Sequence, residues 1–318
     1  MTPRYGMSIP FPGPLDEQAG YFRTLAELGY TDLWSSETSG FDAFTPLALA
    51  ALTAPSARLG SAIVPAFTRG PACIAQSVAA LASVAPGRVA IGIGSSSDVI
   101  VQRWNGIPFE TPLAKVRDVV RFLRRALTGE KVTETYSTFD IRGFRLTSVP
   151  EVQPKILVAA LREKMLRVAG EHADGAILNW LSADDVRTVT PFVKDGGADK
   201  EIVARIFVCP SEDTELVRQK AREFVCAYLN VPVYAKFQRW LGRESLAPMW
   251  ELWQAGDRKG ALAAVPDNVV DELVVHGSPA ACRAHIQRYV DAGVDTPALA
   301  IMPWGVEPTE AARLLAPG

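Results

Sequence analysis

Eight short runs rich in β-forming residues recur along the chain, and nearly every one is followed by a segment with helical spacing. Such alternation of strands with helices is typical of parallel α/β folds. Eight units are the number found in a (β/α)8 TIM barrel. A doubly wound sheet also fits, because strand order cannot be read from one sequence. The predicted strands are residues 4–9, 31–36, 58–65, 88–94, 155–160, 174–179, 201–208 and 296–302.

Two segments are longer than a minimal strand–helix unit requires. The first, residues 95–153 after the fourth strand, contains a predicted helix at 112–127 and a hairpin-like stretch, VTETYSTFDIRGFRL. The second, residues 229–277 after the seventh strand, has a mostly helical pattern. No repeat and no low-complexity linker divides the chain. We therefore predict one domain over residues 1–318, an α/β TIM barrel with insertions after strands four and seven.

Charge and cysteine usage exclude several classes of protein. A formal net charge of −2 gives no electrostatic attraction to nucleic acid. No apolar run approaches the roughly 20 residues that cross a bilayer. The four cysteines are scattered, which favours a reducing cytoplasm over a disulfide-forming compartment. The three histidines lie apart from one another and from the cysteines, so we predict no metal site.

Two helix starts can be predicted from their capping residues. Thr45 followed by Pro46 has the composition of an N-cap and first helical residue. Ser182 and Asp185 have the spacing of a capping box at the start of another helix.

A glycine-rich turn, Gly92-Ile93-Gly94, ends the fourth predicted strand and is followed by three serines. A dinucleotide-binding fingerprint requires a third glycine, where this chain has Ser97, and it belongs in the first strand–helix unit rather than the fourth. In a barrel, the carboxyl ends of the strands face the active site. The turn is therefore predicted to lie at the barrel mouth, where serine hydroxyl and backbone N–H groups meet a ligand.

The block LGSAIVPAFTRGPACIAQSVAALASVAPGRVAIGIGSSSDVIVQRWNG resembles the bacterial luciferase-like family of flavin and deazaflavin barrels. Within that family, the chain is most similar to the actinobacterial branch of coenzyme F420-dependent oxidoreductases. Three further segments support the resemblance, and together they extend it over nearly the whole chain. These segments are GYTDLWSSET (29–38), KILVAALREKMLRVAGEHADGAILNWLS (155–182) and GSPAACRAHIQRYVDAGVDTPAL (277–299).

The resemblance implies a cofactor site at the ends of strands three to six. The third strand would end in a cis peptide, Ala62–Ile63, behind the central ring of the cofactor. The serines after strand four would lie beside the cofactor's polyol and phosphate, and small residues ending strand five would let it approach. Relatives have Gly-Pro where this chain has Arg162-Glu163, although Arg162 itself offers a charged contact to phosphate. The implied residues are Ser61, Ala62, Ile63, Ser95, Ser96, Ser97, Ala159, Ala160, Leu161, Arg162, Asn179 and Trp180.

Glu37 is the candidate catalytic residue. Deazaflavin dehydrogenases of the family carry Asp-His at the end of strand two, where this chain has Ser36-Glu37. A partly buried carboxylate there could exchange a proton with the substrate while a hydride moves. The alternative is a carboxylate that caps a neighbouring backbone group. Trp180 likewise has two interpretations, as a wall of the pocket or as a side chain packed under the second insertion.

The function implied by the resemblance is hydride transfer between coenzyme F420 and a small organic substrate. The alternatives are an FMN-dependent monooxygenase that receives reduced flavin from a partner reductase, and a non-catalytic flavin-binding barrel. The resemblance also implies a homodimer and, as a further partner, a flavin or F420 reductase. We expect no nucleic-acid or membrane partner.

Overall fold

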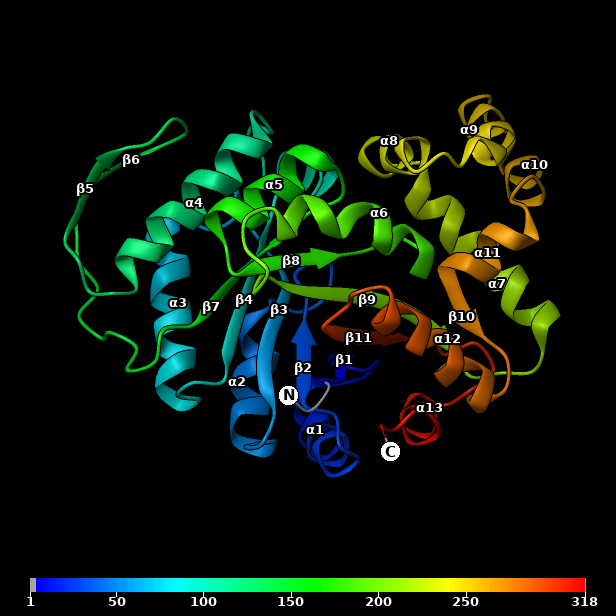
Figure 1. The fold of residues 1–318 in the computed structure, drawn as a ribbon, viewed down its shortest axis with the longest axis horizontal. Helices are drawn as coiled ribbons and strands as arrows, with labels where there is room; N and C mark the ends of the chain where they lie inside the picture. The colour runs from blue at the N-terminus through cyan, green and yellow to red at the C-terminus, as the bar shows by residue number, and fades with distance from the viewer. Residues whose placement is uncertain (1–3, 318) are drawn as a thin grey trace.

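Eight parallel strands close into a barrel in the computed structural model, which describes residues 4–317 (Figure 1). Around the ring the order is β1, β2, β3, β4, β7, β8, β9 and β11. Pairing of β8 with β9 and of β11 with β1 closes the ring. The strands are β1 (Gly6–Ser8), β2 (Asp32–Ser35), β3 (Arg58–Pro65), β4 (Val89–Gly94), β7 (Lys155–Ala159), β8 (Gly175–Leu178), β9 (Glu201–Cys209) and β11 (Thr296–Ile301).

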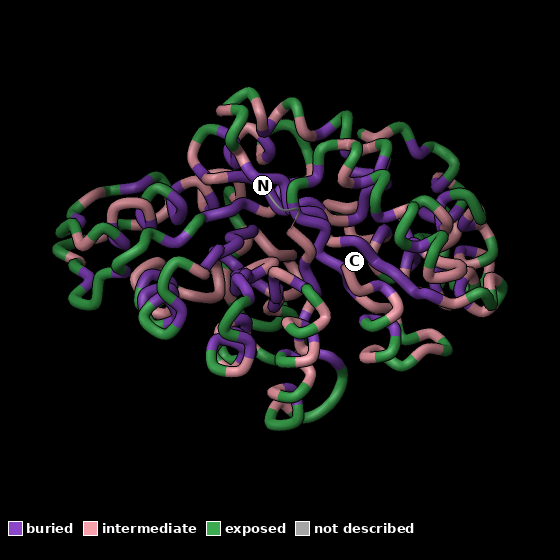
Figure 2. Tube along the Cα trace, turned by 60° about the horizontal axis from the view of Figure 1, so that its bottom comes forward, coloured by how far each residue is buried: buried purple, intermediate pink, exposed green. Residues whose placement is uncertain are grey.

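Helices surround the barrel and cover its outer face (Figure 1). Alanine and branched apolar side chains on their inner faces pack against the strands, so the buried part of the chain forms the centre of the molecule (Figure 2). The helices that follow the barrel strands are α1 (Gln18–Glu27), α2 (Phe44–Thr53), α3 (Pro71–Val84), α4 (Pro112–Ala126), α5 (Glu163–His172), α6 (Ala183–Lys194), α7 (Thr214–Leu229), α12 (Pro279–Asp291) and α13 (Pro308–Leu314); the 3-10 turn η1 (Leu15–Glu17) precedes α1.

All eight predicted strands are present, and the predicted TIM barrel is confirmed. The doubly wound alternative is wrong, because that fold has an open sheet whereas this ring is closed. One further parallel strand, β10 (Val274–His276), pairs with the end of β9. It was missed because three residues are too few to show an alternating pattern.

The two longer segments lie between β4 and β7 and between β9 and β11. The first holds a π-helical turn, η2 (Val99–Trp104), as well as α4 and a hairpin that projects from one end of the molecule (Figure 1). The second forms a helical group at the opposite end of the view. Their elements are β5 (Val132–Thr135) and β6 (Asp140–Phe144) in the hairpin, and α8 (Pro232–Trp240), η3 (Glu244–Leu246), α9 (Ala247–Gln254), α10 (Arg258–Ala263) and α11 (Asp267–Leu273) in the helical group.

One of the two predicted helix starts is wrong. Helix α2 begins at Phe44, and the carboxylate of Asp42 accepts hydrogen bonds from the backbone N–H of Phe44 at 2.8 Å and of Thr45 at 3.1 Å. A nearby carboxylate thus performs the capping that was assigned to Thr45. The Ser182–Asp185 capping box at the start of α6 is confirmed.

A single tryptophan fills the middle of the barrel. Trp34 on β2 is 1% exposed, and the glycines Gly6 and Gly60 on the flanking strands leave room for its ring. A Cβ atom on Gly60 would lie 2.2 Å from the ring, far inside van der Waals contact. The ring therefore closes the barrel below the mouth.

Below Trp34, a network of charged side chains closes the amino-terminal end of the barrel. Arg58 on β3 pairs with Asp32 on β2 and donates two hydrogen bonds to Glu201 on β9, at 2.9 and 2.5 Å. Lys155 on β7 adds a third contact to Glu201 at 2.9 Å. Each buried charge in this network has an opposite charge beside it, as burial requires.

No helix within residues 4–317 has both the length and the apolar character needed to cross a membrane.

Candidate active site

The carboxyl ends of the parallel strands meet at one mouth of the barrel, which is where active sites of this architecture lie. Polar and small side chains at these ends are only partly buried, in contrast to the sealed interior below them. They come from all eight strands: Ser8, Ser36, Ala62, Ile63, Ser95, Ala159, Asn179, Arg205 and Met302.

The structure brings together most of the residues predicted for a cofactor. Strand β3 has a register shift between Ser61 and Val64, and the predicted cis peptide Ala62–Ile63 is present there. A Cβ atom on Gly94 would lie 2.9 Å from the side chain of Ile63 and 3.1 Å from Cβ of Ala159. Glycine therefore lets the ends of β3, β4 and β7 approach closely. Ala62, Gly94 and Ala159 carry little or no side chain at these ends, and the three residues are called the cradle below.

Ser61 supports this cradle from below. It is fully buried, and its hydroxyl donates to the carbonyl oxygen of Gly92 at 3.1 Å while accepting from the Gly92 N–H at 3.0 Å. These bonds join β3 to β4 where the register shift interrupts their ladder. The geometry places Ser61 beneath the mouth.

The serine loop after β4 lies at the rim of the cradle. Ser96 has a φ of 61°, in the left-handed region, which turns the chain away from the strand direction. The hydroxyl of Ser97 accepts a hydrogen bond from the N–H of Ile100 at 3.3 Å and so holds the start of η2. Ser95 is partly exposed beside them, and its hydroxyl donates a hydrogen bond to the carbonyl oxygen of Ser96 at 3.3 Å.

The amino-terminal end of α5 offers free N–H groups on the same side of the mouth. Ala160 is held by a hydrogen bond from its N–H to the carbonyl of Ile177, and the first helical hydrogen bonds reach back only to Arg162. In the described part of the chain, no side chain caps this helix. The N–H groups from Leu161 to Lys164 are therefore available to an anion, with the exposed side chain of Arg162 beside them.

Asn179 and Trp180 follow β8 and differ in accessibility. Asn179 is partly exposed at the mouth, and its carbonyl accepts a hydrogen bond from the N–H of Trp180 at 3.0 Å. Trp180 is 1% exposed, with its ring 4.5–5.0 Å from the rings of Phe207, Phe224 and Tyr228. It thus packs under the second insertion and supports the aromatic residues that face the mouth.

Glu37 lies in a fixed ion pair. Its carboxylate accepts hydrogen bonds from Arg69 at 3.0–3.2 Å and from the backbone N–H of Ala43 at 3.1 Å. Its neighbours Ser36 and Thr38 line the cavity described below, whereas Glu37 does not. The geometry gives Glu37 a role in holding the loop between β2 and α2, and its participation in proton transfer stays a prediction.

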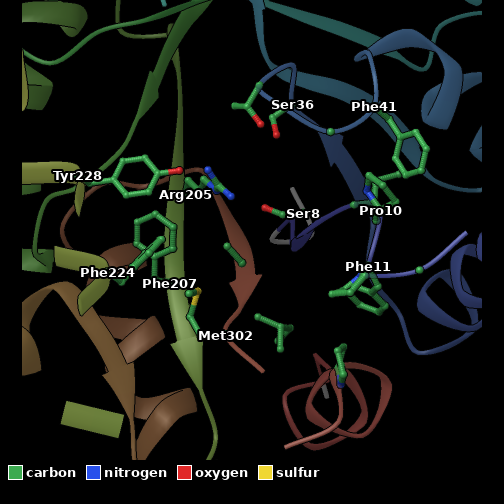
Figure 3. Close-up of a pocket in the computed structure, with 18 residues that line it drawn as sticks. Ser8, Pro10, Phe11, Ser36, Phe41, Arg205, Phe207, Phe224, Tyr228 and Met302 are labelled. Atoms are coloured by element: carbon green, nitrogen blue, oxygen red, sulfur yellow. The ribbon is translucent and has the colours of Figure 1, made fainter. Parts of the chain in front are cut away.

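A cavity of about 420 Å³ opens on the other half of the mouth, between β1, β2, β9 and β11 (Figure 3). Phe207, Phe224, Tyr228 and Met302 form one wall, and Phe11 with Phe41 lies across from them. The cavity residues that were not predicted from the sequence include Ser8, Ser36, Arg205, Phe207, Phe224 and Tyr228. The one available signal was Arg205, a charge among the apolar residues that follow Glu201 in the strand EIVARIFV.

No cluster of three or more histidine, cysteine, aspartate or glutamate side chains suited to a metal ion is found among residues 4–317.

Residues 3–296 match the family of luciferase-like monooxygenases. The chain belongs to this family. It is 26% identical to a 5,10-methylenetetrahydromethanopterin reductase of Methanolobus tindarius over 98% of both chains. It is 27% identical to an F420-dependent glucose-6-phosphate dehydrogenase of Mycobacterium avium over 79% of this chain and 76% of that protein.

The fold is also similar to that of a solved structure. The coenzyme F420-dependent tetrahydromethanopterin reductase of Methanopyrus kandleri superimposes with a TM-score of 0.83. The superposition covers 99% of this chain and 98% of that one, at 19% sequence identity. Identity this low establishes the shared barrel and leaves the chemistry to the residues of the mouth.

Proposed function

We propose that this luciferase-like protein is an oxidoreductase that transfers a hydride between coenzyme F420 and a small organic substrate. The observation that carries the proposal is the cradle of Ala62, Gly94 and Ala159 beside the uncapped start of α5. A flat ring system fits against small side chains, and a phosphate fits against free N–H groups. One curated relative, named as an F420-dependent glucose-6-phosphate dehydrogenase, supports the same cofactor.

The residues of the mouth divide into two halves with different tasks. Ala62, Ile63, Gly94 and Ala159 would hold the ring system, and Leu161 to Lys164 would hold the phosphate. The cofactor, when bound, supplies or accepts the hydride. The aromatic wall on the other half excludes water from the substrate, which keeps the transfer isolated from solvent.

The choice between F420 and FMN is tested by titrating both, side by side, into the purified protein after removal of any bound cofactor. Fluorescence of each cofactor reports binding. We expect F420 to bind more tightly, because Arg162 and Lys164 are exposed at the start of α5, where the acidic tail of F420 would pass. Tighter binding of FMN would overturn the proposal and favour a flavin-dependent monooxygenase, the activity for which the family is named.

Two variants test the position of the cofactor. Ala159→Leu places a branched side chain in the cradle and should weaken binding at least tenfold. Arg162→Glu reverses the charge beside the free N–H groups and should weaken binding as well. The matched controls are Ala280→Leu on the exposed face of α12 and Arg142→Glu on the hairpin, both expected to bind F420 like the unmodified protein. Unchanged binding in both test variants would mean that the cofactor lies elsewhere.

A further inference from the structure

Arg205 is a charged side chain that has no charged partner among residues 4–317. It lies on β9 and lines the cavity at the mouth, where it is only partly buried. In the structure of residues 4–317, its guanidinium makes no ion pair, and its neighbours are the ring of Phe207 at 5.1 Å and the phenols of Tyr228 and Tyr234. Burial lowers the pKa of Arg205, and the two phenols only partly oppose this effect. The described protein groups therefore do not offset the free-energy cost of removing this charge from water.

The contrast with Arg58 shows that this arrangement is unusual in the same barrel. Arg58 is more deeply buried than Arg205, but its hydrogen bonds to Glu201 and its ion pair with Asp32 outweigh burial and raise its pKa. A protein retains an uncompensated charge mostly at a functional site, where a ligand completes it. Arg205 is thus poised to receive a negative charge from outside the chain.

Arg205 stands across the barrel from the cofactor cradle. Around the closed ring, β9 is four strand steps from β3 in either direction, through β4, β7 and β8 or through β2, β1 and β11. The cavity lies on the β9 side, and Figure 3 shows the hydroxyl of Tyr228 directed toward Arg205. A molecule held at Arg205 would extend over the aromatic wall and present its other end to the space above Ala62 and Ile63.

The charge and the shape of the cavity define which ligand fits beside Arg205. Among the described residues that line the cavity, Arg205 is the single charged one, so a ligand with one negative charge would neutralise the site. A planar guanidinium pairs with both oxygens of a carboxylate. Phe207, Phe224 and Tyr228 form an apolar wall suited to an aromatic body, and hydroxyls such as those of Ser8 and Ser36 face it (Figure 3).

We propose that Arg205 anchors the carboxylate of the substrate, and that the substrates of this protein are small aromatic carboxylic acids that carry an alcohol or carbonyl group at the end remote from the carboxylate. The alcohol would give a hydride to oxidised F420 and a proton to solvent, and the carbonyl would take both back in the presence of reduced F420. The assignment of such an acid as a substrate rests on the proposed hydride-transfer function. The binding of the acid at Arg205 can be measured independently of that function.

The test measures binding of benzoate, neutral benzamide and phenyl phosphate by isothermal titration calorimetry. The protein is used with and without saturating F420. We expect benzoate to bind at least tenfold more tightly than benzamide, and more tightly than phenyl phosphate, which carries a second charge. Absence of benzoate binding, or tighter binding of phenyl phosphate, would overturn the assignment.

The variants Arg205→Leu and Arg205→Gln test whether Arg205 is the residue that binds the carboxylate of benzoate. Both should weaken benzoate binding at least tenfold and leave benzamide binding and F420 affinity within about twofold of the unmodified protein. Arg205→Leu should also melt at the same temperature or higher, because it removes an unpaired charge; a purely structural arginine would give a lower melting temperature. The control is Arg142→Leu, an exposed site on the hairpin.

The outcomes separate this inference from the proposed function. Loss of F420 affinity in the Arg205 variants would place Arg205 on the cofactor and overturn the inference. Arg205-dependent benzoate binding in a protein that binds no F420 would leave the anchor in place and reject the hydride-transfer function instead.

Discussion

At the scale of single residues, the contacts of Glu37 determine which role its carboxylate can have. Glu37 follows β2 at the position predicted for a catalytic residue, yet Arg69 and the N–H of Ala43 engage both of its carboxylate oxygens. Arg69 comes from the loop before α3, 32 residues away in sequence. The ion pair between Glu37 and Arg69 holds the loop that carries Thr38 and Phe41, two residues that line the cavity.

The ion pair is tested by a double-mutant cycle with Glu37→Gln and Arg69→Met. Each single variant should lower the free energy of unfolding by about 1 kcal/mol, since the pair is only partly exposed. The double variant should lose little more than either single one, with a coupling of about 1 kcal/mol. Urea unfolding gives all three values. A Glu37 that serves only in proton exchange would instead leave stability within about 0.5 kcal/mol.

At the scale of elements, the second insertion is attached to the barrel through a short chain of buried hydrogen bonds. Gln238 on α8 donates to the carbonyl oxygen of Trp180 at 2.7 Å, and Arg243 donates to Gln238 at 3.1 Å. Arg243 also donates to Asp185 at the start of α6 at 2.6 Å. The aromatic wall of the cavity therefore depends on α8 being held in place.

Arg243→Met should remove this attachment. Arg243 is 8% exposed, so its loss leaves Gln238 and Asp185 without their buried partner. We expect the free energy of unfolding to fall by roughly 3 kcal/mol, measured by urea unfolding. Arg187→Met is the matched control on α6, because Arg187 makes an exposed ion pair with Asp184; its cost should stay below about 1 kcal/mol. An equal fall in the free energy of unfolding for the two variants would contradict a structural role for these buried hydrogen bonds.

At the scale of the whole molecule, the charge network below Trp34 links strands from opposite sides of the ring. Burial alone would raise the pKa of Glu201, but hydrogen bonds and charges from Arg58 and Lys155 lower it from 4.5 to about 2. A carboxyl group with a lowered pKa in the folded state stabilises the fold above its unfolded pKa. That contribution is lost as the pH falls from about 4.5 toward about 2.

Acid unfolding tests this network. The shift corresponds to about 3 kcal/mol of stability that should disappear across this pH range. In Glu201→Gln, the free energy of unfolding should be lower at pH 7 and should fall less steeply between pH 4.5 and 2, measured by urea unfolding at each pH. Glu251→Gln changes an exposed carboxylate and should retain the slope of the unmodified protein. The same slope in Glu201→Gln would show that other carboxylates account for the acid sensitivity.

Local pattern by itself determined the eight strands and their alternation with helices, because periodicity is a property of neighbouring residues. The pattern left a barrel and a doubly wound sheet open, and the loops predicted to bind a cofactor came from the family resemblance. Even within the local pattern, the start of α2 was misplaced, since Asp42 caps it. Only the tertiary structure decided that Glu37 meets Arg69 and that Trp180 is buried under α8. It also decided that Arg205 faces a cavity opposite β3, with no acidic partner in the described part of the chain. Those facts depend on contacts between segments far apart in the chain, and the closure of the ring determines which distant side chains meet.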